Sequence, residues 1–200
     1  PDTRVKDLSE RLAKKGNQVK VFTSDIDCSK DKQLKSTKNL KIHYLPAKEI
    51  AHTPIISSLY NELMKIPQDS IFHVHVAQAY VPEVVYMVCK KRNIPYIAHI
   101  RGNPEPSSFI GKLILNPYKK IFLKIFLKNA SKIIALNEDY KKLFQDKYNL
   151  DSKKFVVIPN ATDFKIIKEK DLENKNKLKN ILFVGRLTSE KNIESIIKSL

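Results

Sequence analysis

The residues best suited to bind a phosphate stand near the carboxyl end of the chain. Gly185 and Arg186 follow an apolar run at 181–184, and Lys191 comes shortly after them. A guanidinium and an ammonium group hold phosphate oxygens through charge-assisted hydrogen bonds, and the first turn of a helix adds unpaired N–H groups that favour an anion. These residues therefore predict a site for a phosphate or diphosphate. The alternative is a solvated turn in a lysine-rich chain.

A strand and a helix must position these cations. Residues 181–184 have the composition of a buried strand, and the aliphatic residues of 193–200 recur at the spacing of one helical face. In a parallel α/β unit, the loop after a strand lies in the crevice at the carboxyl edge of the sheet, where ligands bind. Residues 180–200 are therefore predicted to open a domain that binds the diphosphate.

A second group of candidate residues follows two apolar strands in the middle of the chain. His75 stands near the carboxyl end of the strand predicted at 71–76, and Arg101 and Gly102 follow the strand predicted at 96–100. A glycine lets a ligand approach the backbone closely. We therefore predict that His75, Arg101 and Gly102 share one wall of a crevice. The alternative for Arg101 is surface exposure without a function.

The H-x-H sequence of His73 and His75 raises the question of a metal site, because it places two imidazoles on one face of a strand. His99 could supply a third ligand, but no carboxylate or thiolate stands at a telling spacing. We therefore predict no metal, and we expect His73 to be a hydrogen-bonded histidine of the core. His75 is better placed to touch a ligand.

Short apolar strands alternate with helices along most of the chain. The strands are expected at 19–23, 40–45, 71–76, 96–100, 131–136 and 155–158. This alternation predicts an α/β fold, a Rossmann-like parallel sheet with helices on both faces. Residues 1–163 are expected to form this domain without its first strand, residues 164–179 a charged linker, and residues 180–200 the first strand and helix of a second Rossmann-like domain.

Residues 110–129 form the most amphipathic segment. One face carries Tyr118, Ile121, Phe122, Ile125 and Phe126, and the opposite side carries Lys120, Lys124 and Lys128. We favour a helix that packs on the core and exposes its lysines to solvent. The alternative is a helix that lies on an anionic membrane surface, with Leu123 and Leu127 widening its apolar side.

The chain of 200 residues has a formal charge of +16, which suits a nucleic acid, an anionic membrane or a phosphorylated ligand. Lysine is spread along nearly every predicted helix, so we expect nucleic acid not to be a partner. No apolar run reaches the roughly 20 residues of a membrane span, and Cys28 and Cys89 form no C-x-x-C motif. We expect a cytoplasmic protein, at most peripheral on the inner face of the membrane.

Six segments resemble, in order, motifs of the retaining nucleotide-sugar glycosyltransferases with the GT-B fold, the family-four or group-one type. They are K-K-G-N-Q-V-K-V-F-T, H-V-H, I-P-Y-I-A-H-I-R-G, A-S-K-I-I-A-L-N-E, V-V-I-P-N-A-T-D and V-G-R-L-x-x-x-K. Together they cover nearly the whole chain. Asn17 and Arg101 stand where many members have histidine, and Ala161 and Thr162 replace a Gly-Val pair.

The resemblance implies a role for each matched residue. Arg186 and Lys191, beside Gly185, would bind the donor diphosphate and stabilise the charge on the leaving group. His75 would position the reacting sugar or acceptor, and no metal or other cofactor is implied beyond the nucleotide-sugar itself. Weaker members of the cleft would be Arg101, Gly102, Glu138 and Asn160.

The expected function is transfer of a sugar from a nucleotide-diphosphate donor to a glycan, lipid or other acceptor, with retention of configuration. An alternative is a nucleotide-sugar epimerase or hydrolase on the same fold, because fold does not fix function. A further alternative is a basic module that binds nucleic acid or a membrane surface. The family's glycine-rich turn and paired-glutamate motif do not occur between Pro1 and Leu200, so we expect a fragment, truncated at both ends, that is inactive alone.

Overall fold

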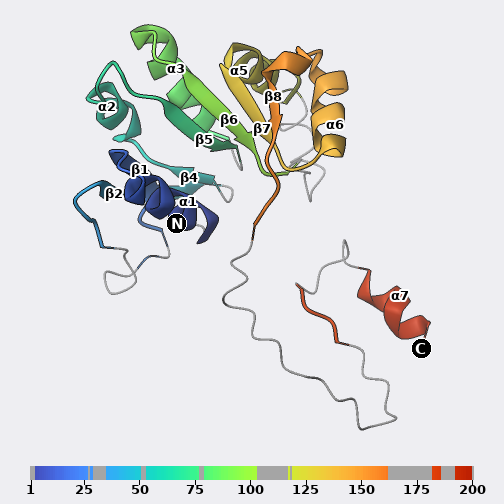
Figure 1. Cartoon of the computed structure of the whole chain (residues 1–200). Helices are drawn as coiled ribbons and strands as arrows, with labels where there is room; N and C mark the ends of the chain where they lie inside the picture. The colour runs from blue at the N-terminus through green and yellow to red at the C-terminus, as the bar shows by residue number, and fades with distance from the viewer. Residues whose placement is uncertain are drawn as a thin grey trace. The chain divides into compact units, whose positions relative to one another are not determined.

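A computed structural model of the chain describes residues 3–26, 28, 35–50, 53–76, 79–102, 117, 119–161, 182–185 and 192–199. The chain forms two compact units, Pro1–Asn160 and Ala161–Leu200. The larger unit combines strands and helices in alternation, as Figure 1 shows. The smaller unit contains one described helix.

A four-stranded parallel sheet forms the centre of the larger unit. Its strands, in spatial order, are β5 (Phe72–Val76), β6 (Tyr96–Ile100), β7 (Lys132–Ala135) and β8 (Phe155–Val157). Each strand pairs with the next one in the sequence, and a helix connects each pair. Parallel neighbours require such crossover connections. The predicted α/β fold with a Rossmann-like parallel sheet is therefore confirmed.

The connecting helices have clear local reasons for their bounds. They are α3 (Val81–Arg92), α5 (Lys124–Asn129) and α6 (Glu138–Tyr148), with a short 3₁₀ turn, η3 (Ser152–Lys154), after α6. Pro82 lies in the first turn of α3, where a missing N–H costs nothing. Asn137 caps α6 because its side-chain oxygen accepts a hydrogen bond from the N–H of Tyr140 at 2.8 Å. Asn93 and Asn149 end α3 and α6 in the left-handed conformation.

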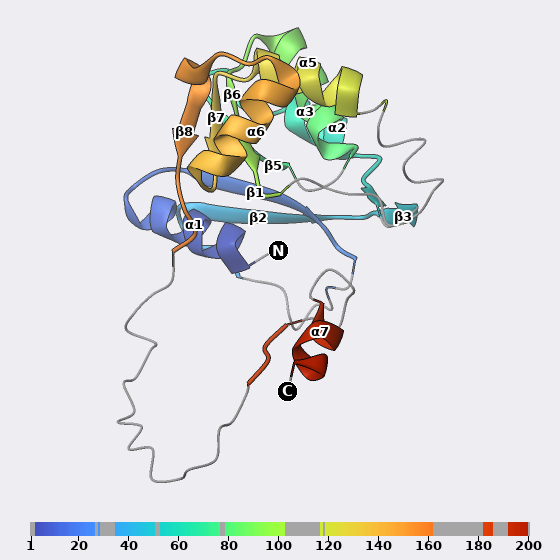
Figure 2. The ribbon, with the colours of Figure 1, turned by 90° about the vertical axis from the view of Figure 1, so that its right-hand side faces the viewer.

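The amino-terminal part of this unit adds two small sheets of two strands each. The elements of this part are α1 (Thr3–Lys14), β1 (Val19–Ser24), β2 (Leu40–Leu45), β3 (Lys48–Ile50), β4 (Thr53–Ile55) and α2 (Leu59–Met64). Gly16 turns the chain between α1 and β1 with a φ of +91°, which glycine adopts without strain. Strands β1 and β2 pair in parallel, as Figure 2 shows along their length. The hairpin β3–β4 was not predicted from the sequence.

The core of the larger unit lies between the sheet and its helices. Strands β5 and β6 bury alternate residues, among them Val74 and Ala98, whereas the residues between these positions are only partly buried. Phe126 and Leu127 of α5 and Val88 of α3 are fully buried in the same cluster. One face of β5 and β6 therefore anchors the core, and the other face carries the partly buried histidines.

The helix of residues 119–129 differs in part from its prediction. Phe126 is fully buried, together with Leu123 and Leu127, but Ile121 and Ile125 are 63% and 41% exposed. The prediction that the two isoleucines lie on the buried face is therefore wrong. The segment starts as a π-helix, η2 (Lys119–Leu123), whose wider turn shifts the phase of the side chains that an α-helix would present. Most of residues 110–118 lie outside the described part.

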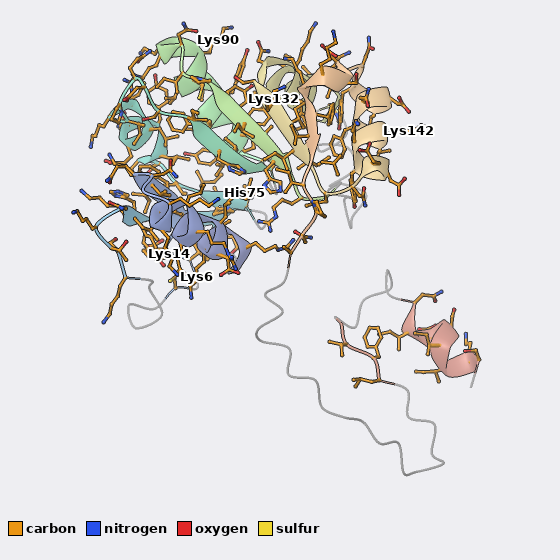
Figure 3. The ribbon with its side chains drawn as sticks, viewed as in Figure 1. Lys6, Lys14, His75, Lys90, Lys132 and Lys142 are labelled. Carbon is orange, nitrogen blue, oxygen red and sulfur yellow. The ribbon has the colours of Figure 1, made fainter. Side chains whose placement is uncertain are left out.

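Lysines of the larger unit occur on many elements, as Figure 3 shows. Lys6 and Lys14 are on α1, Lys90 on α3, Lys132 on β7 and Lys142 on α6. This spread is unlike the single basic stripe of a nucleic-acid interface. Among the described helices, none combines the length and the apolar character that crossing a membrane requires. Cys28 and Cys89 are free.

The smaller unit departs from the predicted strand. Leu182 and Val184 are 86% and 85% exposed, in a segment that is not a strand. The prediction of a buried strand here is wrong, because this segment has no pairing strand within the described residues of the unit, and an unpaired strand does not persist. The helix predicted after it occurs as α7 (Ile193–Lys198).

Candidate functional site

Four predicted residues of the larger unit follow the carboxyl ends of neighbouring strands. His75 is near the end of β5, Arg101 directly follows β6, Glu138 comes soon after β7, and Asn160 comes soon after β8. All four strands are parallel, so their carboxyl ends share one edge of the sheet. Ligands of open α/β sheets bind at this edge, which makes it the candidate site.

His75 and Arg101 are in contact at this edge. The Nη1 atom of Arg101 lies 3.2 Å from Nδ1 of His75. A guanidinium group only donates hydrogen bonds, so Nδ1 of His75 must be the acceptor. A neutral His75 in this contact therefore carries its proton on Nε2, and the ring presents an N–H donor there. The structure thus brings two predicted residues together, while their role toward a ligand stays a prediction.

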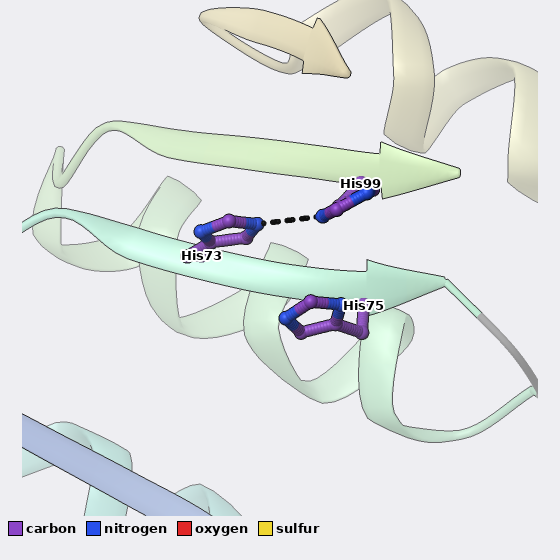
Figure 4. A group of neighbouring side chains, drawn as sticks. All are labelled: His73, His75 and His99. Atoms are coloured by element: carbon purple, nitrogen blue, oxygen red, sulfur yellow. Dashed lines mark hydrogen bonds between the residues drawn. The ribbon is translucent and has the colours of Figure 1, made fainter. Parts of the chain in front are cut away.

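His73 and His99 form a second contact beside the first. The Nε2 atom of His73 lies 3.1 Å from Nδ1 of His99, across β5 and β6, as Figure 4 shows. The ring of His75 lies 4.8 Å from each of the other two rings, measured between centroids. The expectation that His73 is hydrogen-bonded is confirmed, with His99 as its partner. The ring of His73 is only partly buried, because it lies on the less covered face of the sheet.

The surroundings keep two of these histidines neutral. The pKa of His99 is lowered to about 4, mainly by burial and then by His73, Arg101 and Arg4. Burial, and then the charge of Arg101, also lowers the pKa of His73. Desolvation and nearby cations both disfavour an imidazolium ion. The Nε2 atom of His99 is buried and has no hydrogen-bond partner within the described part of the chain.

Arg4 is a residue of this edge that the sequence did not single out. Its NH1 group donates to Oδ1 of Asn160 at 3.2 Å, and its charge acts on His99. Arg4 stands in the first turn of α1, where the helix dipole favours anions over cations. A cation at such a position needs interactions from elsewhere in the fold. The position of a cation in the first turn of a helix was the signal in the sequence that could have pointed to Arg4.

The remaining predicted residues have local surroundings that do not decide their roles. Glu138 forms an ion pair with Lys141 at 2.9 Å, and its side chain is 72% exposed. A Cβ atom on Gly102 would meet no atom of the described residues within 4 Å, so their packing does not require glycine there. A Cβ atom on Gly185 would come within 2.9 Å of the tip of the Phe183 ring, which is 36% exposed and can move aside, so packing does not require glycine there either. The ligand-binding roles of all three stay predictions.

Arg186 and Lys191, the predicted diphosphate ligands, lie outside the described residues. Their role therefore stays a prediction from the sequence. The described site consists of the edge that carries the histidines, Arg101 and Arg4. It offers cations and imidazole groups, which suits hydrogen bonding to an oxygen-rich anionic or hydroxylated ligand.

The family model described as Glycosyltransferase Family 4 matches residues 2–165, which is most of the chain. The chain belongs to glycosyltransferase family four. A comparison with curated proteins finds no match. The parallel sheet with its flanking helices is consistent with the Rossmann-like amino-terminal domain of the GT-B fold, as the resemblance implied. Membership supports glycosyl transfer, with a nucleotide-sugar donor and an acceptor, and does not favour the epimerase, hydrolase or basic-module alternatives.

Proposed function

We propose that this protein transfers a hexose from a nucleotide-diphosphate donor to a hydroxyl group of a glycan or lipid acceptor, with retention of configuration. The bond between the anomeric carbon and the donor phosphate breaks, and the nucleoside diphosphate leaves with the bonding electrons. The acceptor hydroxyl gives its proton to the leaving diphosphate, and its oxygen bonds to the same face of the anomeric carbon. The observation that carries the proposal is the His75–Arg101 contact at the ligand-binding edge of a family-four domain.

The proposal assigns a role to each of four polar side chains. Arg186 and Lys191 bind the diphosphate and stabilise the negative charge that grows as it leaves, so the transfer itself needs no metal ion or organic cofactor. His75 donates a hydrogen bond from Nε2 to a hydroxyl of the sugar or acceptor. Arg101 is a positioning residue, because its contact with Nδ1 keeps the His75 proton on Nε2.

Replacing Arg186 with alanine is expected to lower kcat/KM for sugar transfer by about 100-fold, the size of effect seen when one preorganised donor to a developing anion is removed. The measurement compares the variant with the native protein. It follows nucleoside diphosphate release and product formation with a panel of nucleotide-sugars. The Lys142→Ala variant, which changes an exposed residue of α6, is the matched control and should retain wild-type kcat/KM. Unchanged kcat/KM in the Arg186 variant, or a product of inverted configuration, would contradict the proposal.

His75 offers a sharper test of its own role within the same assay. A glutamine at this position can place its amide near the Nε2 atom, whereas an asparagine places it near Nδ1. The His75→Gln variant should therefore retain more activity than His75→Asn. Equal activities of the two variants would show that a donor at Nε2 does not matter.

The exposed side of η2 and α5 supports a second proposal, peripheral contact with the anionic inner leaflet of a membrane. Ile121 and Ile125 are exposed beside exposed Lys124 and Lys128. Such a face can bind through apolar burial and attraction to anionic lipids, each lysine contributing about 1 kcal/mol. Liposomes with anionic lipid should co-sediment the native protein. Replacing Lys120, Lys124 and Lys128 with glutamine should abolish most of this binding, and unchanged co-sedimentation would dismiss the proposal.

A further inference from the structure

We propose that His73, His75 and His99 form a binding site for a divalent transition-metal ion of the zinc class. One ring nitrogen from each histidine lies within 4.8 Å of the corresponding nitrogens of the other two. Figure 4 shows the three rings on the adjacent strands β5 and β6. From the sequence we expected no metal, because no carboxylate or thiolate stands at a telling spacing beside His73, His75 and His99.

The spacing of the nitrogens fits a metal ion. In a tetrahedral site with metal–nitrogen bonds of roughly 2.0–2.1 Å, two ligand nitrogens stand about 3.3 Å apart. The Nε2 atom of His73 and the Nδ1 atom of His99 are 3.1 Å apart, so this pair is already at ligand spacing. His75 needs only a side-chain adjustment to bring its nitrogen from within 4.8 Å to the same separation.

The backbone places the three side chains on one face of the sheet. His75 and His99 are directly paired in the register of β5 and β6, and His73 is two residues earlier on β5. Paired residues of neighbouring strands point to the same face, and so do residues i and i+2 of one strand. The approach of the three rings therefore follows from strand pairing, which is the rigid part of the fold.

A metal ion binds the lone pair of a neutral imidazole. One of the facing nitrogens of His73 and His99 carries the proton of their hydrogen bond, so metal binding moves this proton to the other ring nitrogen or into solvent. The buried Nε2 atom of His99 has no partner within the described residues, so ordinary hydrogen bonding leaves this ring incompletely satisfied. Three imidazoles without a carboxylate favour zinc, cobalt, nickel or copper over magnesium or calcium.

Arg101 competes with metal binding at His75, so the metal ion and the arrangement used for sugar transfer exclude each other. Its donor group occupies Nδ1 of His75, and its positive charge repels a cation. A metal ion must either replace Arg101 at Nδ1 or displace the proton from Nε2 into solvent. Binding at Nε2 removes the N–H donor, whereas binding at Nδ1 keeps this donor but moves the ring toward the other two histidines, so in either case zinc should inhibit sugar transfer. This consequence rests on the proposed function, whereas the binding site does not.

Metal binding can be measured without any activity assay. The full chain, stripped with a chelator, is titrated with Co²⁺, whose visible absorption reports tetrahedral nitrogen coordination, and then with Zn²⁺ as competitor. We expect saturation at one ion per chain and displacement of Co²⁺ by Zn²⁺ but not by Mg²⁺. Absence of a saturable absorption band, or a band that Mg²⁺ removes equally well, would overturn the proposal, whatever the outcome of the transfer assay.

Two variants make the test specific. His99→Gln should weaken Zn²⁺ binding by more than the roughly 10–100-fold that removal of an outer-shell partner costs. The matched control is His43→Gln, because His43 of β2 also has a buried Nε2 atom without a partner in the described structure, but stacks on Phe22 away from the cluster. Equal loss of Zn²⁺ binding in the two variants would refute the site.

Two further substitutions cover the case in which His99→Gln does not fold. His75→Gln changes a ring near the end of β5 that is only partly buried, and it should also weaken Zn²⁺ binding at least tenfold. Arg101→Gln removes the repelling charge and offers an oxygen to the second ring nitrogen of His75, so it should raise Zn²⁺ affinity about tenfold. Unchanged affinity in both variants would overturn the proposal.

Discussion

Replacing Phe126 with alanine is expected to lower the free energy of unfolding of the larger unit by about 3–5 kcal/mol. Phe126 is fully buried in α5, and its ring stacks on Tyr96 of β6 with centroids 4.9 Å apart. The Tyr96 hydroxyl donates a hydrogen bond to the Phe126 carbonyl oxygen. Truncation removes the buried ring and leaves a cavity that this hydrogen-bonded pair of elements cannot close by collapsing.

Urea unfolding followed by circular dichroism measures this loss. The matched control is Ile121→Ala in the same helical segment, because Ile121 is 63% exposed and should change the free energy by no more than about 0.5 kcal/mol. Phe126→Leu, which keeps much of the buried volume, should fall between the two. A similar loss for Ile121→Ala and Phe126→Ala would show that the helix does not bury the face seen in the structure.

The main sheet was predictable because each strand carries its own local signal. Strands β5 and β6 are short apolar runs that precede or follow a helix with clear ends, such as the one closed by Asn93. Parallel pairing then follows from the alternation of strands and helices. The segment 182–184 has the same apolar composition, but it is exposed and not a strand. Apolar composition alone does not make a strand when no neighbour pairs with it.

The buried face of the helix at 119–129 was harder to predict. An α-helical projection groups Ile121 and Ile125 with Phe126, whereas the structure buries Leu123 and Leu127 beside Phe126. The π-helical start of the segment changes the angle between successive side chains, and nothing in the residue types indicates such a turn. The sequence therefore predicted that a helix forms here, but it did not predict which side chains this helix buries.

The candidate site was predictable only in part, for a related reason. The positions of His75 and Arg101 after their strands were visible in the sequence, because strand ends mark the binding edge. The approach of His99 to His73 depends on the register between β5 and β6, which the sequence pattern does not determine. The same holds for Arg4, which reaches Asn160 from the other end of the unit's sequence.

Acidification is expected to destabilise the larger unit through His99 as the pH falls from 7 to 4. The folded state holds the pKa of His99 at about 4, below its ordinary value of 6.5, mainly through burial and then through the charges of His73, Arg101 and Arg4. Between these two values the unfolded chain binds more protons than the folded chain, so stability falls as pH falls. The lowered pKa of His73 acts in the same direction.

Urea midpoints at pH 7, 6, 5 and 4, in buffer with a metal chelator, test this linkage. Wild type should lose stability steadily below about pH 6.5, whereas His99→Gln should lose markedly less, because it has no proton to take up at this position. The His43→Gln variant, which keeps the cluster, controls for the loss of a partly buried histidine elsewhere in the unit. The same slope in His99→Gln as in wild type would contradict the assignment. A reduced slope in His99→Gln alone would locate the acid-sensitive step at the strands that also form the candidate site.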